Sequence, residues 1–308
     1  MNNISNYYFQ FKMIRVGTDC SGMDTPIYAL KKLSIPYSHE WACDINKYAR
    51  QTIMANYNPK RLYTDMTARD INDLADIDLY IAGFPCQTFS SAGQRQGFND
   101  ARGQIFYYCL DVINHKNPKY FILENVKGLY HHDKGNTFKV IMNELNKTNY
   151  SIYHQILNAK DYNSPQSRPR IYIIGVRKDL NKHFEFPKAI PLQKSLKDII
   201  DYTDMTRHPC MPSVRHITDQ LDISKSFFDL GFIEYNKRVN TEYADCVVAK
   251  NQMYNGFIGR YANTLELLRL QGFDDDFKVV VSKTQIKRQI GNAMNVNVLM
   301  HLLERLLK

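Results

Sequence analysis

The stretch Asp78-Leu79-Tyr80-Ile81-Ala82-Gly83-Phe84-Pro85-Cys86 predicts a buried strand that ends in a loop carrying a cysteine. Four apolar residues in a row are typical of a strand that is covered on both faces of a parallel sheet. Glycine and proline then end the strand. The cysteine therefore lies just beyond the carboxyl end of a strand, where its thiol is set up to act as a nucleophile.

The same pattern recurs on both sides of this stretch. Further strands are expected at 13–17, 39–43, 120–123 and 171–176, with helices at 45–56, 103–115 and 137–145 between them. This alternation predicts an α/β fold with a doubly wound, mostly parallel sheet. A last helix is expected at 295–308, where valine and leucine recur at helical spacing, and we expect it to pack on the sheet.

The 308 residues are enough for one large domain and one small domain. After Pro187 the alternation fades, so we expect 1–187 and 286–308 to form the large domain, 188–253 the small one and 254–285 a bridge. The formal net charge of +9 favours a polyanionic partner. Between 188 and 245, eight Lys and Arg stand against nine Asp and Glu, so the positive charge belongs to the large part.

The six cysteines include no CxxC pair and no cysteine and histidine cluster with zinc spacing. We therefore expect reduced thiols, without a disulfide framework or a structural metal. The chain shows no apolar core of signal-peptide length and no apolar run long enough to span a membrane. These features predict an intracellular protein.

Three further motifs follow the Cys86 loop along the chain. Glu124-Asn125-Val126 ends the next strand, Gln166-Ser167-Arg168-Pro169-Arg170 precedes another, and Gln289-Ile290-Gly291-Asn292-Ala293 lies near the end. In this order they resemble the cytosine-C5 DNA methyltransferase family, of the bacterial or viral type with a single catalytic chain. The resemblance covers nearly the whole chain. It implies a Rossmann-like catalytic domain that uses S-adenosylmethionine, with 188–253 as the target-recognition domain and 254–285 as an interdomain hinge.

Carbon 5 of cytosine accepts a methyl group only after the ring has been activated by covalent addition at carbon 6. The resemblance implies that Cys86 makes this addition. It also implies that Glu124 holds ring nitrogen 3 and the exocyclic amine. By the same match, Arg170 holds the cytosine O2 and Arg168 supports the site.

The cofactor turn corresponds to Thr18-Asp19-Cys20-Ser21-Gly22-Met23-Asp24-Thr25. The family pattern there is Asp-x-Phe-x-Gly-x-Gly, so Gly22 is kept, Cys20 replaces the aromatic residue and Asp24 replaces the second glycine. Asp44, 22 residues past Gly22, is expected to bind the ribose hydroxyls. The other expected cofactor contacts are Ile45 on adenine, Asp65 on its amino group, Met66, Pro85, Ile105, Asn292 and Ala293. The product would be S-adenosylhomocysteine.

The segment 90–103 is rich in glycine and contains Arg95 and Arg102. It predicts a loop that closes over a cytosine flipped out of duplex DNA. Gln87 and Ser90 are expected to contact the same DNA. The stretch from Arg260 to Phe273 resembles the family segment that bridges the two domains, and we expect a structural role for it.

The resemblance places the chain with the restriction-modification enzymes, as a monomer acting on double-stranded DNA in the cytoplasm or nucleoid, or in the host compartment that holds the DNA if it is viral. A restriction endonuclease partner is not visible in this chain. Two alternatives stay open at this point. One is a tRNA cytosine-5 methyltransferase of the same fold, and the other is a catalytically weak DNA-binding relative, suggested by the altered cofactor turn.

Overall fold

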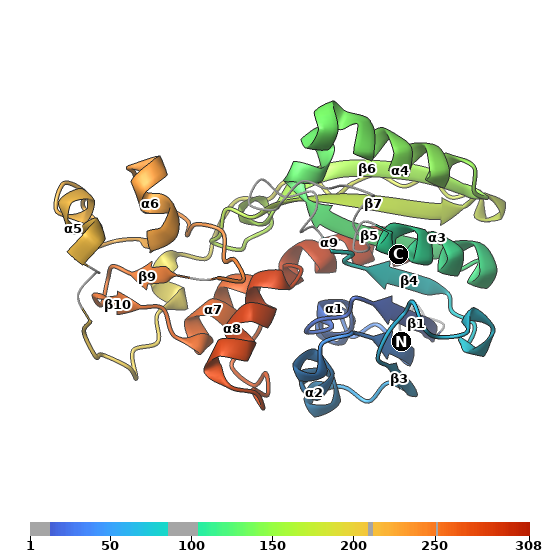
Figure 1. The fold of residues 1–308 in the computed structure, drawn as a ribbon, viewed down its shortest axis with the longest axis horizontal. Helices are drawn as coiled ribbons and strands as arrows, with labels where there is room; N and C mark the ends of the chain where they lie inside the picture. Colours follow the sequence, from blue (N-terminus) through green and yellow to red (C-terminus); the bar gives the residue numbers. More distant parts are fainter. Residues whose placement is uncertain (1–12, 86–103, 209–211, 251) are drawn as a thin grey trace, which may run out of the picture.

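The computed structural model describes residues 13–85, 104–208, 212–250 and 252–308. Its main feature is a seven-stranded sheet in the order β3-β2-β1-β4-β5-β7-β6 (Figure 1). The strands are β1 (Ile14–Asp19), β2 (Tyr37–Cys43), β3 (Arg61–Tyr63), β4 (Leu79–Ala82), β5 (Tyr120–Val126), β6 (Tyr150–Asn158) and β7 (Pro169–Arg177). The first five are parallel, whereas β7 runs antiparallel to β5 and to β6. The predicted doubly wound α/β fold is confirmed.

Helices cover both faces of this sheet. The helices α1 (Thr25–Lys32), α2 (Lys47–Asn56) and α9 (Val296–Leu307) contribute to one core, and α3 (Ile105–Lys116) and α4 (Asn136–Asn146) to the other. Successive strand residues point to opposite faces. In β4, Leu79 and Ile81 therefore join the first core, and Tyr80 and Ala82 join the second. Because both faces are buried, the strand is apolar at every position.

A second, antiparallel sheet in the order β10-β9-β8 lies at the other end of the long axis (Figure 1). It consists of β8 (Phe227–Asp229), β9 (Met253–Asn255) and β10 (Arg260–Tyr261), accompanied by α5 (Pro212–Thr218) and α6 (Leu230–Asn236). The helices α7 (Thr264–Gln271) and α8 (Lys283–Asn292) lie between the two sheets. The strand β10 comes from the segment expected to be a bridge, and the domain limits stay a prediction.

Short 3-10 turns complete the described secondary structure at η1 (Ile71–Asp73), η3 (Lys127–Gly135), η4 (Ala159–Asp161), η5 (Lys178–Leu180) and η6 (Leu196–Ile199). The expected helix at 45–56 begins at Lys47 because Asn46 caps it, with its side chain accepting from the Tyr48 amide at 2.9 Å. None of the described helices is both long enough and apolar enough to cross a membrane.

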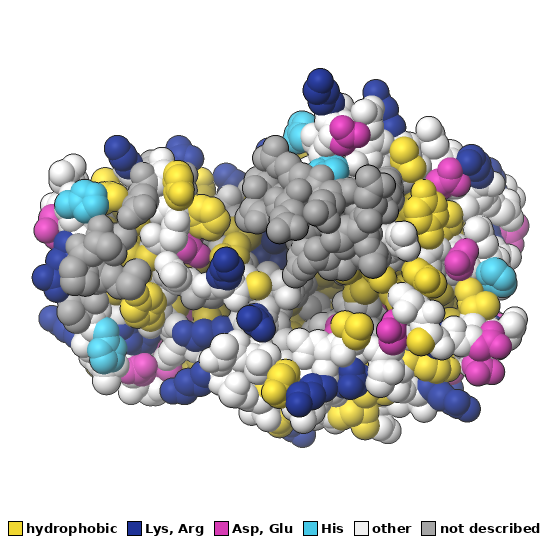
Figure 2. All heavy atoms as spheres, viewed as in Figure 1, with side chains coloured by type: hydrophobic (Ala, Val, Ile, Leu, Met, Phe, Trp, Pro, Cys, Tyr) yellow, Lys and Arg dark blue, Asp and Glu magenta, His cyan; other side chains and the backbone are white. Residues whose placement is uncertain are grey.

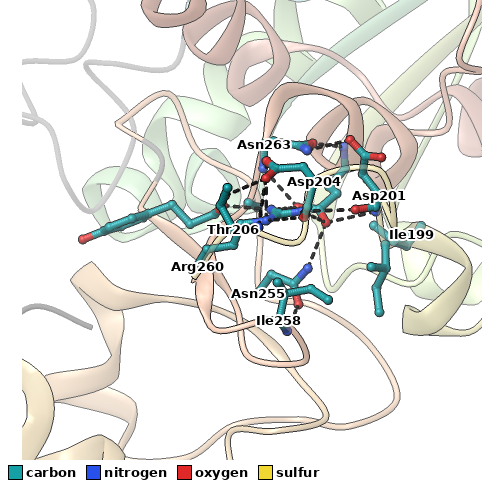
Figure 3. A network of polar contacts seen from close by, with 12 residues as sticks. Ile199, Asp201, Asp204, Thr206, Asn255, Ile258, Arg260 and Asn263 are labelled. Carbon is teal, nitrogen blue, oxygen red and sulfur yellow. Dashed lines mark hydrogen bonds and ion pairs between the residues drawn. The ribbon is translucent and has the colours of Figure 1, made fainter. Parts of the chain in front are cut away.

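A buried ion pair fixes the segment that connects the sheets (Figure 3). Arg260, which is 2% exposed, donates to Glu266 over 2.8 and 3.0 Å. Its guanidinium also donates to the backbone carbonyl of Asp204, over 3.0 and 2.9 Å. Asn255 donates to the same glutamate over 2.8 Å. Arg260 therefore joins α7, the small sheet and the 201–204 segment as a structural residue.

Candidate active site

The carboxyl ends of the parallel strands bring the predicted residues to one edge of the large sheet. Gly22 follows β1, Asp44 follows β2, Asp65 follows β3 and Pro85 follows β4. Glu124 lies near the carboxyl end of β5. Such an edge is where doubly wound sheets bind their ligands. The antiparallel strand β7 starts at the same edge, since Arg170 pairs in register with Val126.

Glu124 and Arg170 are in direct contact at this edge. The Arg170 Nε lies 3.3 Å from Oε1 of Glu124, and both side chains are largely buried. Burial raises the pKa of Glu124 above its ordinary value, while the charges of Arg170 and Arg168 act in the opposite direction. A carboxyl group in this setting keeps its proton to higher pH than an exposed one and can donate a hydrogen bond.

The chain that leads to the cysteine loop is tied to this pair. Asn125 donates from its side chain to the carbonyl of Phe84 over 3.1 Å. A side chain added at Gly83 would meet Met294 at 3.0 Å and Oε2 of Glu124 at 3.6 Å. The backbone before Cys86 therefore passes directly beside the glutamate. The predicted residues that lie outside the described part of the chain are Cys86, Gln87, Ser90, Arg95 and Arg102.

Arg168 is a buried connector of three chain segments. Its guanidinium donates to the carbonyls of Val247 (2.7 Å), Gly291 (3.0 Å) and Ala293 (2.7 Å). Its own amide donates to the side chain of Asn158 over 2.8 Å. Arg168 is 2% exposed, and its guanidinium also donates to the Cys246 sulfur over 3.3 Å. The role of Arg168 in supporting a bound cytosine stays a prediction.

Gln166 of the same motif also forms hydrogen bonds with distant segments of the chain. Gln166 donates to the carbonyl of Leu270 over 2.9 Å and accepts from the amide of Val247 over 2.9 Å. Gln271 donates to the carbonyl of Ile290 over 2.8 Å. Gly291 lets the backbone of residues 248–249 pass so closely that a Cβ atom would collide with it. Ala293 is buried beside this crossing, whereas Asn292 is exposed.

The predicted cofactor turn has an unusual backbone. Cys20, Gly22 and Asp24 all adopt left-handed conformations, with φ of 49°, 55° and 51°. The amide of Gly22 donates to Oδ2 of Asp44 over 2.7 Å, and the amide of Asn46 donates to Oδ1 over 2.8 Å. Burial raises the pKa of Asp44. Asp44 thus joins the loops after β1 and β2.

Asp24 of this turn lies beside His39 in the protein interior, and the sequence did not indicate this contact. Oδ2 of Asp24 lies 3.2 Å from Nε2 of His39 and accepts from the Thr18 hydroxyl at 3.3 Å. Burial raises the pKa of Asp24 well above its ordinary value and lowers that of His39 to about 4. Both shifts favour the uncharged forms of the two groups. The buried side chain of Asp24 thus stabilises the turn through its contacts with Thr18 and His39.

The other predicted cofactor residues surround the same edge. Ile45 is 77% exposed. Asp65 accepts from the amide and the hydroxyl of Thr67, each over 2.8 Å. Met66 is buried, while Pro85 and Ile105 are half-buried. Among the described residues, no group of three or more His, Cys, Asp or Glu side chains is placed to hold a metal ion.

Comparison with known proteins agrees with this geometry. The family model for C-5 cytosine-specific DNA methylases matches residues 19–308. The Type II methyltransferase M.HaeII of Haemophilus aegyptius is 36% identical over 274 residues, which is 85% of this chain and 82% of the relative. M.HhaI of Haemophilus parahaemolyticus is 34% identical, covering 86% of this chain and 85% of its own length. The crystal structure of S. pombe Dnmt2 methyltransferase shares the fold, with a TM-score of 0.72 at 21% identity over 96% of this chain and 99% of that one.

Proposed function

Because the chain belongs to the C-5 cytosine-specific DNA methylase family, we propose that it transfers a methyl group from S-adenosylmethionine to carbon 5 of a cytosine flipped out of duplex DNA. The observation that carries this proposal is the contact of Glu124 with Arg170 beside the chain leading to Cys86. These are the groups that activation of a cytosine ring requires.

We propose the following roles for the residues of this site. Cys86 adds to carbon 6 of the ring, and electron density moves towards nitrogen 3. Glu124, whose pKa is raised by burial, supplies a hydrogen bond and a proton to nitrogen 3. Arg170 binds the cytosine O2, and Arg168 keeps β7, residue 247 and residues 291–293 in one arrangement around it. The addition leaves carbon 5 nucleophilic enough to accept a methyl group, after which loss of the carbon 5 proton to a base breaks the bond between carbon 6 and the Cys86 sulfur.

The residues around the first two strands fit S-adenosylmethionine, which supplies an electrophilic methyl group when bound. Asp44 presents a carboxylate at the end of β2, where the ribose hydroxyls of a nucleoside ligand are bound in folds of this kind. The exposed side chain of Ile45 covers one face of adenine, and Asp65 accepts from the adenine amino group. Asn292 and Ala293 complete the methionine end of the pocket.

The charge of the chain supports a DNA substrate. The formal net charge is +9, and Lys and Arg side chains lie over the part of the surface that carries α7 and α8 (Figure 2). Each phosphate contact by such a side chain releases counterions, so we expect DNA affinity to fall steeply with salt. Arg95 and Arg102 are proposed to close on the DNA, with the protein acting as a monomer.

The test is transfer of labelled methyl groups from S-adenosylmethionine to duplex DNA and, in parallel, to tRNA. We expect transfer to DNA, and none with Cys86→Ser, because an alcohol is a far poorer nucleophile at neutral pH. The wild type should also form a stable adduct with DNA that contains 5-fluorocytosine, and the variant should not. Transfer to tRNA alone would reject the DNA substrate, and more than a few per cent residual turnover in the variant would reject the covalent step.

A further inference from the structure

Cys246 lies between the two arginines of the cytosine site. Its sulfur is 3.3 Å from Nη1 of Arg168 and 3.8 Å from Nη2 of Arg170. The same Arg170 contacts Glu124 through Nε at 3.3 Å. A thiol, two guanidiniums and a carboxyl group therefore form one cluster, and the roles proposed above use every member except the thiol.

Backbone hydrogen bonds fix the position of this sulfur. The segment before Cys246 runs beside the loop that precedes β7: the amide of Ala244 donates to the Pro165 carbonyl over 2.8 Å, and the amide of Ser167 donates to the Ala244 carbonyl over 2.9 Å. On the other side, the amide of Val247 donates to the Gln166 side chain over 2.9 Å. The thiol is thus held between two anchored residues.

The pKa of Cys246 is shifted in the opposite direction from the pKa values of the other described cysteines. Burial raises the pKa of Cys20 well above its ordinary value and raises the pKa values of Cys43 and Cys109 to about 12. Burial also acts to raise the pKa of Cys246, but the nearby charges of Arg170 and then Arg168 outweigh it and bring the pKa below the ordinary value. Neighbouring positive charge is the usual cause of an ionised thiol.

On the basis of the proposed function, we infer that Cys246 is a positioning residue of the cytosine site, whose sulfur contacts the guanidiniums of Arg168 and Arg170 and offsets part of their positive charge beside Glu124. The physical reason is the balance of charge. Two guanidiniums beside a buried carboxyl group favour its ionised form. A thiolate on their other side offsets part of that charge, so Glu124 keeps its proton to higher pH. Tyr172, which pairs in register with Glu124, stays neutral because burial raises its pKa.

The first test measures the thiol itself and needs no catalysis. Native protein is alkylated with iodoacetamide over a range of pH, and the tryptic peptide of residues 239–250, which contains Cys246 as its single cysteine, is quantified by mass spectrometry. We expect a midpoint below the ordinary thiol pKa of about 8.5 and a higher midpoint in Arg170→Met. The peptide of residues 16–31, which carries Cys20, is the internal control and should react only at higher pH. A Cys246 midpoint at or above the ordinary value, or no alkylation of this peptide, would overturn the inference.

The second test measures the effect on Glu124 through the pH profile of kcat at saturating DNA and cofactor. Cys246→Ser and Cys246→Ala remove the negative charge, so the alkaline limb should move to lower pH by about one unit, which lowers kcat about tenfold on that side. Cys246→Asp restores a negative charge and should return the limb towards the wild-type position. A decrease in kcat that is equal at all pH values, or that is the same in all three variants, would show that Cys246 acts only through packing and would overturn the inference. If the wild type transfers no methyl group to DNA, the proposed function fails, while the alkylation result stands by itself.

Discussion

Arg69 forms a bidentate ion pair with Asp19. Nη1 donates to Oδ1 and Nη2 to Oδ2, each over 2.6 Å, and both side chains are almost fully buried. The hydroxyl of Tyr80 donates to the same carboxylate over 2.7 Å. The aspartate that opens the cofactor motif is therefore occupied by protein groups and acts on the turn by holding the end of β1.

Replacing Arg69 with methionine should destabilise the fold by about 3 to 5 kcal/mol, because it leaves a buried carboxylate without its counter-charge. Urea unfolding followed by circular dichroism measures this change. The matched control is Arg15→Met, since Arg15 forms a partly exposed pair with Asp78 whose loss should cost about 1 kcal/mol or less. Equal losses in the two variants would show that the Asp19 pair is no more important than a surface contact.

Glu124→Gln should slow methyl transfer by roughly 10² or more, which is the usual order for lost acid assistance. In the wild type the rate should fall as pH rises through the raised pKa of Glu124, because the protonated form is the active one. Single-turnover rates over a pH series test both points. Glu144→Gln, at an exposed ion pair with Lys147 on α4, is the control and should leave the rate unchanged. An unchanged rate in Glu124→Gln would move the activating role elsewhere.

Asp44→Ala should weaken S-adenosylmethionine binding by about 1.5 to 3 kcal/mol, through lost hydrogen bonds to the ribose and a loosened Gly22 turn. Isothermal titration calorimetry with the cofactor measures the change. DNA affinity without cofactor should stay as it is, and the exposed control Asp73→Asn should leave both constants unaltered. Wild-type cofactor affinity in Asp44→Ala would place the ribose elsewhere.

The free energy of unfolding of Asp24→Asn, relative to that of the wild type, should increase as pH rises. Native Asp24 keeps its proton to higher pH because burial raises its pKa, whereas the unfolded chain releases that proton above about pH 4. The folded wild type therefore loses stability as pH rises from there. The amide is neutral at every pH and avoids this loss. His39, with its pKa lowered to about 4, has the opposite effect, since stability falls as pH drops from about 6.5 towards that value.

Unfolding free energies of wild type and Asp24→Asn, measured from pH 5 to pH 8, give the difference directly. The slope of that difference should approach 1.4 kcal/mol per pH unit while the native carboxyl stays protonated. A pH-independent difference would show that Asp24 is ionised in the folded protein.

The parts of the fold that the sequence predicted are those where burial is two-sided. The strands β4, β5 and β7 read as apolar runs because helices cover both faces. The strand β6 was missed because it lies at the sheet edge, where His154 and Gln155 are exposed and interrupt the run. The helix α1 was also missed, since its eight residues are too few to establish a clear period.

In the candidate site, too, the sequence predicted some features and not others. Asp44 and Glu124 could be placed from the sequence, because parallel strands bring their carboxyl ends to one edge. The bonds of Arg168 to Val247 and Gly291 could not, since they join residues 79 and 123 positions apart and depend on packing. For the same reason neither the contact of Asp24 with His39 nor that of Cys246 with the arginines was foreseen.

The packing of α9 against α1 has a consequence for how the chain is made. Ile27 and Leu30 of α1 share a core with Leu299 and Leu302 of α9, although α9 is translated long after α1. While the ribosome is still working, the first helix therefore presents an apolar surface that nothing permanent covers. Such surfaces are where nascent chains aggregate or are held by chaperones. This face of the sheet can close only after α9 has been translated, so its core stays incomplete while the residues between α1 and α9 are being made.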